Sequence, residues 1–566
     1  MSRRTPLRAL VVFTLLAAAC SGNGKDPQPT APPTGSVVPT GSPDAPSGFT
    51  EEIACGLPPQ WLQRIRNGYH PERSADIQIL PRVPNFVGSG LPHVGPWPFT
   101  SEVPMFWYGP GYIKPVGPVQ EPVTSADIVG TLDHLLDSSF EPADGEPMLD
   151  GLVPVDDRPD PPRLAIVMIW DGSGRNVLEQ WPDAWPTLDG LRSQGAWYEH
   201  ATVGSSPTSS AQIHATIGTG AFPTNHGVVG HSIRIDGQIV SPWKNGPREL
   251  LFDTFADHYD RERDNEPLIG ESGTVPIQLG MMSRGAFAEG GDKDLAVLRT
   301  PGNATTLGAE GVAWNIPEGF DQWYEYPSYA NDLPPLATYF DDVNLDAGDG
   351  KRDGLWHGQP FEQSDELLDG FHTPARVPYQ TRLIEEVIER EGFGADEVPD
   401  LFYINYKLID TLGHLYGIED PAMQDAVSAQ DQSLDRFVRF LNEQVGENRW
   451  VLLVTADHGS LMSAQATGAF QISAERLHSS IQERFDADGD DVPVIDQVKQ
   501  TEIFMNIAEL EEQGHTLEDV SRFILTLRQE QLPVPGLAIP APQAKVFQVA
   551  FPARALLSLP CLPAES

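Results

Sequence analysis

The stretch Pro162-Arg-Leu-Ala-Ile-Val-Met-Ile-Trp-Asp-Gly-Ser-Gly174 decides how this chain folds. The residues from Leu164 to Trp170 form a continuous apolar run that ends abruptly in Asp171-Gly172. A run of this length, closed by a turn, is typical of a strand that is buried in a parallel sheet. Ligands of open α/β sheets bind beyond the carboxyl ends of the strands, which is where Asp171 is placed. A buried carboxylate there needs a cation, unless Asp171 merely begins a turn or caps a helix.

Strand and helix patterns alternate along the rest of the chain. Apolar runs at residues 401–408 and 450–455 predict two more buried strands, and a strand is also expected at residues 196–203. Helices are expected over residues 187–194, 210–218, 381–391 and 423–445. This alternation predicts an α/β fold with a mostly parallel central sheet and helices on both faces. Residues 241–374 are irregular and acidic, and we expect them to form an inserted cap region.

The beginning of the chain has the pattern of an export signal. A basic start is followed by an apolar run too short to span a bilayer, and the run ends in Leu-Ala-Ala-Ala-Cys20. Residues 1–20 therefore resemble a bacterial lipoprotein signal, with Cys20 as the lipidated residue that anchors the protein to a membrane. Cleavage at an ordinary Ala-x-Ala site is the alternative, and either route exports the protein to the cell envelope or beyond it. Residues 21–50 are rich in proline, serine and glycine, which predicts a disordered tether.

Composition limits the partners and the cysteine chemistry. The chain has 37 basic and 80 acidic side chains among 566 residues, so a protein that coats nucleic acid is disfavoured. If Cys20 carries lipid, Cys55 and Cys561 remain, and two cysteines outside the cytoplasm are expected to form a disulfide. Two buried, unpaired thiols are the alternative. A disulfide would join the proline-rich segment at residues 51–162, expected to pack on the core, to the end of the main domain at residues 163–566.

Candidate metal ligands follow the other two buried strands as well. Asp410 and His414 come after the first, and their spacing of four places both side chains on one face of a helical turn. Asp457 and His458 come directly after the second, in a tight turn. Each motif alone is a weak signal. Together with Asp171, three motifs at three strand ends predict a metal site.

A candidate nucleophile lies between the first and second of these motifs. Ser210 begins a predicted helix and stands four residues before His214. A hydroxyl at a helix N-terminus is favoured by the helix dipole, and the neighbouring amides can hold a phosphate. A plain N-cap is the ordinary role of a serine at this place, and the two roles are compatible. Thr208 and Ser209 are the alternatives if the helix begins earlier.

These motifs, in this order, resemble the alkaline phosphatase superfamily. They are most similar to the type I phosphodiesterase/nucleotide pyrophosphatase group and to related bacterial phosphatases. The similarity rests on the strand that ends in Asp-Gly, on the stretch from Ser210 through His214 to His226-Gly227, on Asp410-x3-His414, and on Asp457-His458-Gly459. It covers roughly residues 163–458. It implies an alkaline-phosphatase-like fold and a hydrolase that acts on a phosphate ester.

The resemblance implies two zinc ions, with other divalent metals possible. The first ion would be held by Asp171, Asp457 and His458 and would also bind the oxygen of Ser210. The second would be held by Asp410, His414 and a later histidine, for which we choose His478. Ser210 would form a covalent phospho-enzyme that water then hydrolyses.

Two further positions concern the substrate. His231 stands where relatives have an asparagine that contacts a phosphoryl oxygen. Arg284 matches the arginine of a Lys-x-Arg stretch found in some monoesterases, but Met282 replaces the lysine. A missing lysine would weaken the binding of a doubly charged monoester.

We therefore expect a phosphodiesterase or nucleotide pyrophosphatase. A phosphomonoesterase that uses Arg284, or an exported binding lipoprotein with a decayed site, is the alternative. The sequence predicts no oligomeric state.

Overall fold

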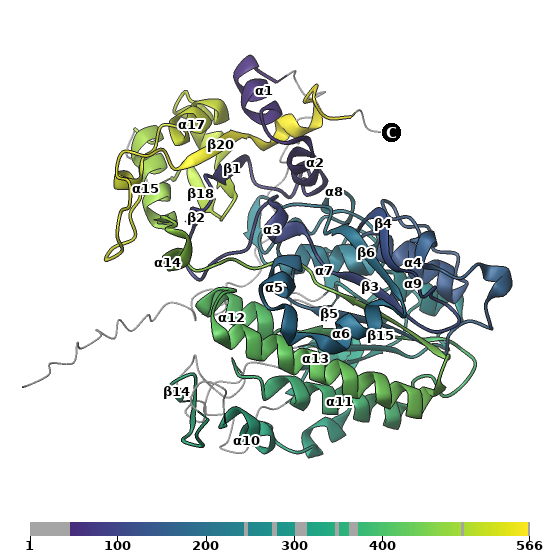
Figure 1. The fold of residues 1–566 in the computed structure, drawn as a ribbon. Coiled ribbons are helices and arrows are strands. Elements are labelled where there is room, and N and C mark those ends of the chain that lie inside the picture. Colours follow the sequence, from purple (N-terminus) through teal and green to yellow (C-terminus); the bar gives the residue numbers. More distant parts are fainter. Residues whose placement is uncertain are drawn as a thin grey trace, which may run out of the picture.

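A computed structural model describes most of the chain after the predicted tether. The described residues are 46–242, 247–273, 280–299, 314–345, 350–360, 372–487 and 492–563. The predicted signal peptide, including Cys20, and most of the predicted tether lie outside them. Figure 1 shows a large α/β unit built on a central sheet and a smaller unit built on a second sheet.

The central sheet has ten strands, and most neighbouring pairs are parallel. Across the sheet the order is β11 (Trp314–Asn315), β10 (Asp294–Arg299), β9 (Ile269–Gly273), β15 (Asp400–Tyr406), β5 (Leu164–Trp170), β16 (Trp450–Thr455), β3 (Met105–Tyr108), β6 (Ala196–Thr202) and β4 (Gly117–Thr124), and β12 (Tyr324–Glu325) pairs with β10. Strands β3 and β11 run antiparallel to their neighbours. The predicted mostly parallel sheet is confirmed.

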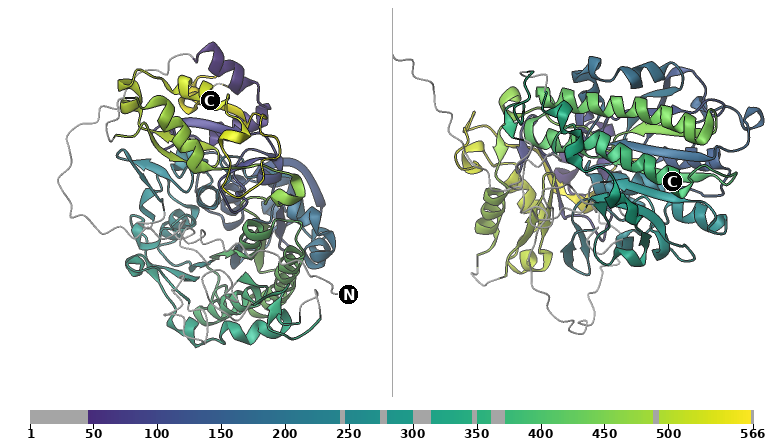
Figure 2. Two further views of the ribbon diagram at one scale, coloured as in Figure 1. Left: turned by 90° about the vertical axis from the view of Figure 1, so that its left-hand side faces the viewer. Right: turned by 90° about the horizontal axis from the view of Figure 1, so that it is seen from below.

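Strand β5 lies at the middle of this sheet and is buried on both faces. Its side chains alternate between two hydrophobic cores, with Ile166 in one and Val167 in the other. The first core is covered by α5 (Arg175–Gln180), α6 (Pro186–Arg192), α11 (Arg376–Glu391), α12 (Leu408–Tyr416) and α13 (Pro421–Leu441). The second is covered by α4 (Asp127–Leu136), α7 (Ser210–Thr219) and α9 (Phe255–Glu262). Helices therefore pack on both faces, as predicted (Figures 1 and 2).

Two stretches without a clear strand pattern supply strands to the central sheet. The proline-rich segment contributes β3, which lies between β16 and β6, and the edge strand β4. Residues 241–374 contribute β9 and β10, so part of the stretch expected as a cap belongs to the core. The remainder includes α10 (Phe340–Val343) and the hairpin of β13 (Leu355–Trp356) and β14 (Gln359–Pro360).

The smaller unit is an antiparallel sheet that joins the two ends of the described chain. Its strands, in spatial order, are β18 (Ile495–Val498), β19 (Glu502–Met505), β1 (Ile77–Pro81) and β20 (Phe547–Pro552). Helices α15 (Ala474–Phe485) and α17 (Leu517–Ile524) cover one face, and α1 (Gly48–Cys55) and α2 (Pro59–Asn67) cover the other. Short elements complete the chain: β2 (Phe86–Val87), α3 (Pro98–Ser101), α8 (Pro223–His226), β7 (Ile233–Ile235), β8 (Gln238–Val240), α14 (Ala464–Thr467), β17 (Gln471–Ile472) and α16 (Ile507–Glu512).

A disulfide joins Cys55, at the end of α1, to Cys561, which is 506 positions later. The pairing is the one that the cysteine count predicts. It ties the first described helix to the last turns of the chain. A search of the described helices finds none that is both long enough and apolar enough to cross a membrane.

Candidate metal centre and nucleophile

Three neighbouring strands of the central sheet end at the candidate site. Strand β5 leads into Asp171, β15 leads into α12 with Asp410 and His414, and β16 leads into Asp457 and His458. Because β15, β5 and β16 are parallel and adjacent, their carboxyl ends meet at one edge of the sheet. The structure thus brings these five predicted ligands together, and all but the half-buried His414 are buried.

The turn after β5 requires a glycine because α12 lies against it. Gly172 has a φ of 76°, and a Cβ atom there would lie 2.7 Å from the Cα atom of Asp410. The amide of Gly172 also donates a 3.0 Å hydrogen bond to Oδ1 of Asp457. Gly172 therefore allows the turn after Asp171 to lie close to Asp410. Its amide also fixes the carboxylate of Asp457.

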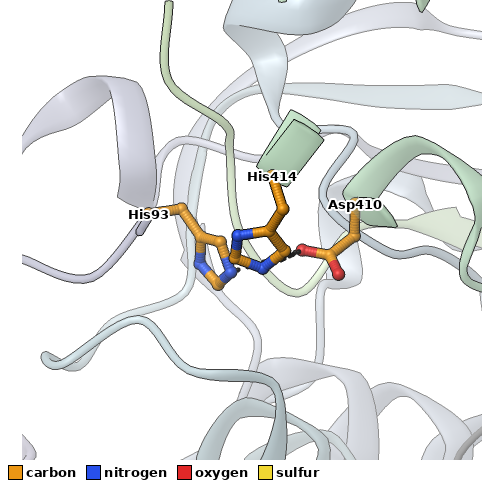
Figure 3. A group of neighbouring side chains, drawn as sticks. All are labelled: His93, Asp410 and His414. Carbon is orange, nitrogen blue, oxygen red and sulfur yellow. Dashed lines mark ion pairs between the residues drawn. The ribbon is translucent and has the colours of Figure 1, made fainter. Parts of the chain in front are cut away.

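A third histidine, His93, completes one ligand group (Figure 3). It lies in the loop between β2 and α3, and its Nε2 is 3.3 Å from Oδ1 of Asp410. The Nε2 of His414 is 3.4 Å from the same oxygen. His93 therefore stands where the sequence analysis placed His478. His478 instead lies on α15 in the smaller unit, where the nearby charge is that of Asp496, and it is in none of the ligand groups formed by the described residues.

Backbone carbonyls fix the orientation of three imidazoles at the centre. The Nδ1 atoms of His93, His414 and His458 lie 3.1, 2.6 and 3.0 Å from the carbonyl oxygens of Thr208, Gly90 and Gly459. Each Nδ1 atom is thus the donor, which leaves each Nε2 free of hydrogen to act as a ligand. Burial lowers the pKa of all three rings, to about 4 for His458, and therefore keeps them neutral at pH 7.

A second ligand group lies beside the first. Asp171 comes close to Asp457 and His214 on one side and to Asp410 and His458 on the other. Nε2 of His458 is 3.6 Å from Oδ1 of Asp171 and 3.2 Å from Oδ2 of Asp457. Asn405, on β15, donates hydrogen bonds to Oδ2 of Asp171 and to Nε2 of His214. His214 in turn donates from Nδ1 to the carbonyl of Ser210 at 2.7 Å. Both nitrogens of His214 are therefore occupied, and this ring orients the site.

The donor set fits divalent metal ions. Oδ2 of Asp457 is buried and accepts no hydrogen bond from the described residues, although such an atom is costly to leave unpaired. Burial, followed by the charge of Asp171, raises the pKa of Asp457 to about 6. Imidazole nitrogens and carboxylate oxygens are the usual ligands of zinc, and a cation between them would satisfy this oxygen. These buried aspartates and histidines are thus a candidate metal site.

Ser210 is the first residue of α7, and its hydroxyl lies beside His458. Its Oγ is 3.3 Å from Nε2 of His458. The alternatives are placed differently. Oγ1 of Thr208 donates to the carbonyl of His93 at 2.7 Å, and Ser209 precedes α7 with a buried Oγ that has no hydrogen-bond partner among the described residues. Among these three hydroxyls, only that of Ser210 has a described contact with one of the predicted metal ligands, namely His458.

Lys407 enters the same site, which the sequence analysis did not predict. It follows β15 directly, and its Nζ donates hydrogen bonds to Oδ1 of Asp171 at 2.7 Å and to Ser210 Oγ at 3.1 Å. It also forms a 2.9 Å ion pair with Oδ2 of Asp410. Burial alone would lower the pKa of Lys407, but the charges of Asp171 and Asp410 raise it above its usual value. The ammonium is thus a fixed positive charge at the centre.

The two expected substrate contacts differ in their surroundings. His231 is exposed, and the charges that act on it are those of Lys407, His93, Lys499 and Asp410, which places it at the edge of the centre. Arg284 is buried and paired with two aspartates, at 2.6 Å with Asp257 and also with Asp253. Its guanidinium therefore stabilises the region around α9. Met282 is buried in the second hydrophobic core.

Comparison with known proteins gives one family and several distant relatives. The model of the family described as type I phosphodiesterase/nucleotide pyrophosphatase matches residues 165–526, well over half of the chain. The chain is 22% identical over 367 residues to alkaline phosphatase PafA of Elizabethkingia meningoseptica, covering 56% of this chain and 64% of the relative. It is 20% identical over 337 residues to a protein of Myroides odoratus named calcium-transporting ATPase, covering 53% and 60%. The matches thus span less than two thirds of these relatives.

Solved structures show a similar but distant likeness. The crystal structure of wild-type PafA matches with a TM-score of 0.48 and 15% identity, covering 69% of this chain and 84% of that one. A phosphonoacetate hydrolase from Sinorhizobium meliloti matches with a TM-score of 0.29 and 17% identity, covering 54% and 59%.

Proposed function

We propose, on the premise that this chain belongs to the type I phosphodiesterase/nucleotide pyrophosphatase family, that it hydrolyses phosphoric esters at a two-zinc centre through Ser210. The observation that carries the proposal is the position of the Ser210 hydroxyl, which lies 3.3 Å from Nε2 of His458, a member of one buried group of possible metal ligands. His93, Asp410 and His414 would hold one ion. Asp171, Asp457 and His458 would hold the other, together with Ser210.

The chain's own residues define how the reaction would proceed. The Ser210 hydroxyl gives up its proton as Oγ attacks phosphorus, an Oγ–P bond forms as the bond to the leaving oxygen breaks, and the leaving oxygen takes up a proton to become an alcohol. Water then breaks the Oγ–P bond and restores the serine hydroxyl. Asn405 and His214 hold Asp171 and the start of α7 in place during both steps. Bound zinc ions would supply positive charge that activates the hydroxyl and offsets charge on the phosphoryl oxygens.

The charges around the centre favour a diester substrate. A monoester carries a second negative charge that needs its own cation. Met282 supplies none, Arg284 is already paired with Asp253 and Asp257, and Lys407 is paired with Asp171 and Asp410. The alternative, a phosphomonoesterase that uses Arg284, would require these ion pairs to break.

One set of assays tests the proposal. We expect hydrolysis of bis(4-nitrophenyl) phosphate to exceed that of 4-nitrophenyl phosphate in kcat/KM. A strong chelator should abolish the activity, and zinc should restore it. Full activity after prolonged dialysis against chelator would contradict the metal centre. A preference for the monoester above about tenfold, or ~1.4 kcal/mol in barrier height, would contradict the diester assignment.

We also propose that the protein is exported and held at a membrane through Cys20. The Cys55–Cys561 disulfide supports export, because disulfides persist outside the cytoplasm. Mass spectrometry of the mature N-terminus tests the anchor. Diacylglycerol on Cys20 is the expected result, and a free N-terminus at a later residue would contradict it.

A further inference from the structure

Each of the three N–H donors of the Lys407 ammonium has an acceptor at the metal centre. An ammonium has three N–H donors, and the three nearest acceptors are Oδ1 of Asp171, Oδ2 of Asp410 and Oγ of Ser210, at 2.7, 2.9 and 3.1 Å. The side chain is mostly buried, with 14% of its surface exposed. Three protein oxygens therefore hold the ammonium at the centre.

These contacts conflict with one of the two proposed ions and leave the other accessible. An ion held by Asp171 and Ser210 would need the two oxygens to which Lys407 donates, at distances near 2.0–2.2 Å. An ammonium at 2.7–3.1 Å from the same oxygens would repel that ion. The ion at His93 and His414 would use Oδ1 of Asp410, whereas Lys407 contacts Oδ2 of that carboxylate. The conflict therefore falls on a single ion position.

We propose that Lys407 is a resident cation that competes with the ion at Asp171 and Ser210, so that the two ion positions have unequal affinities. The position at His93, Asp410 and His414 is filled first. The second ion binds only when the ammonium withdraws from Asp171 and Ser210. This inference rests on the metal centre of the proposed function and concerns how that centre is loaded.

Metal binding of the purified full-length protein tests the competition. Zinc affinities are measured by titration in chelator buffers, for the wild type and for Lys407→Met, which keeps the length of the side chain and removes its charge. We expect one tight and one weak ion in the wild type. In Lys407→Met the weaker ion should bind at least about tenfold more tightly, a change of the size seen when groups around a metal site are altered. Lys499→Met is the matched control, because Lys499 is a nearby cation whose charge acts on His231 and whose own nearest charge is Glu502.

Cadmium-113 NMR shows which position fills first. One resonance at one equivalent, lost in His93→Ala, is expected for the wild type, with a second resonance only at excess cadmium. Equal affinities for two ions in the wild type would overturn the proposal without any variant. An unchanged weak ion in Lys407→Met, or equal tightening in Lys499→Met, would also overturn it. If Lys407→Met does not fold, Lys407→Gln takes its place. Absence of bound zinc in every protein would instead contradict the metal centre itself.

Discussion

Each histidine of the centre is oriented by one backbone contact. The Nδ1 atoms of His93, His414 and His458 face carbonyl oxygens, so the Nε2 atoms face the carboxylates. His93 and His458 also stack, with ring centroids 3.4 Å apart. Because the rings are neutral and their orientations are fixed by hydrogen bonds, their Nε2 atoms are already positioned to bind a metal ion.

The replacement of His93 tests whether this histidine is a ligand. His93→Ala removes one nitrogen of the group shared with Asp410 and His414, so we expect the protein to lose the tighter zinc ion. His478→Ala is the control and should keep its zinc, since His478 lies on α15. Inductively coupled plasma mass spectrometry of both purified variants gives the result. If His478→Ala lost zinc and His93→Ala kept its full zinc content, His478 and not His93 would be the third ligand.

The apolar strand patterns of the sequence indicate the candidate ligands that follow them, but they indicate neither His93 nor Lys407. Asp171, Asp410 and Asp457 follow apolar runs, which are strong signals. His93 stands in a glycine- and proline-rich loop far from them in sequence, and the resemblance placed the third histidine after residue 458. The strand predicted over residues 401–408 includes Lys407, yet β15 stops at Tyr406 and α12 begins at Leu408.

At the scale of elements, the loop that carries His93 depends on the segment before α7. Oγ1 of Thr208 donates to the carbonyl of His93 at 2.7 Å and accepts from the amide of Gly95 at 3.1 Å. Nδ1 of His93 donates to the carbonyl of Thr208. The segment that presents Ser210 thus also positions His93.

Thr208→Val should therefore weaken zinc binding while Ser210 keeps its place. Valine has the same shape but cannot hold the His93 loop, and we expect a loss of affinity of about tenfold or more. Thr219→Val is the matched control, because Thr219 is a buried threonine at the other end of α7. Titration with zinc in chelator buffers measures both. An equal loss in the two variants, or none in Thr208→Val, would show that this hydrogen bond does not position the ligand.

Strands with polar or small residues were the elements that sequence patterns did not reveal. Strand β9 reads Ile-Gly-Glu-Ser-Gly, and glycine, glutamate and serine carry little strand signal. It becomes a core strand because β15 and β10 pair with it on both sides. By contrast, β5 and β16 are continuous apolar runs, and both have the predicted bounds.

At the scale of the whole molecule, the disulfide joins the two ends of the described chain. Cys55 and Cys561 are 506 positions apart, so the bond closes a very long loop of the unfolded chain. Loss of such a bond commonly costs about 2–4 kcal/mol of stability. The smaller unit should be affected most, because α1 packs against β20 within it.

The double variant Cys55→Ser/Cys561→Ser should consequently unfold at a lower temperature than the wild type. Zinc content and phosphoesterase activity should stay the same at 25 °C, since the metal centre lies at the edge of the central sheet. Differential scanning calorimetry under non-reducing conditions provides the comparison. An unchanged melting temperature would show that this bond contributes nothing to stability.

The central claim is that Ser210 is the nucleophile of a metal-dependent phosphoesterase. The most direct measurement is the hydrolysis of bis(4-nitrophenyl) phosphate by Ser210→Ala, with Ser209→Ala as its neighbour control and with zinc measured in each protein. Our account predicts that Ser210→Ala folds, retains zinc and loses at least about a thousandfold in kcat, as expected for loss of a covalent nucleophile. It also predicts that Ser209→Ala stays near the wild type. A zinc-loaded Ser210→Ala with wild-type turnover would contradict the account.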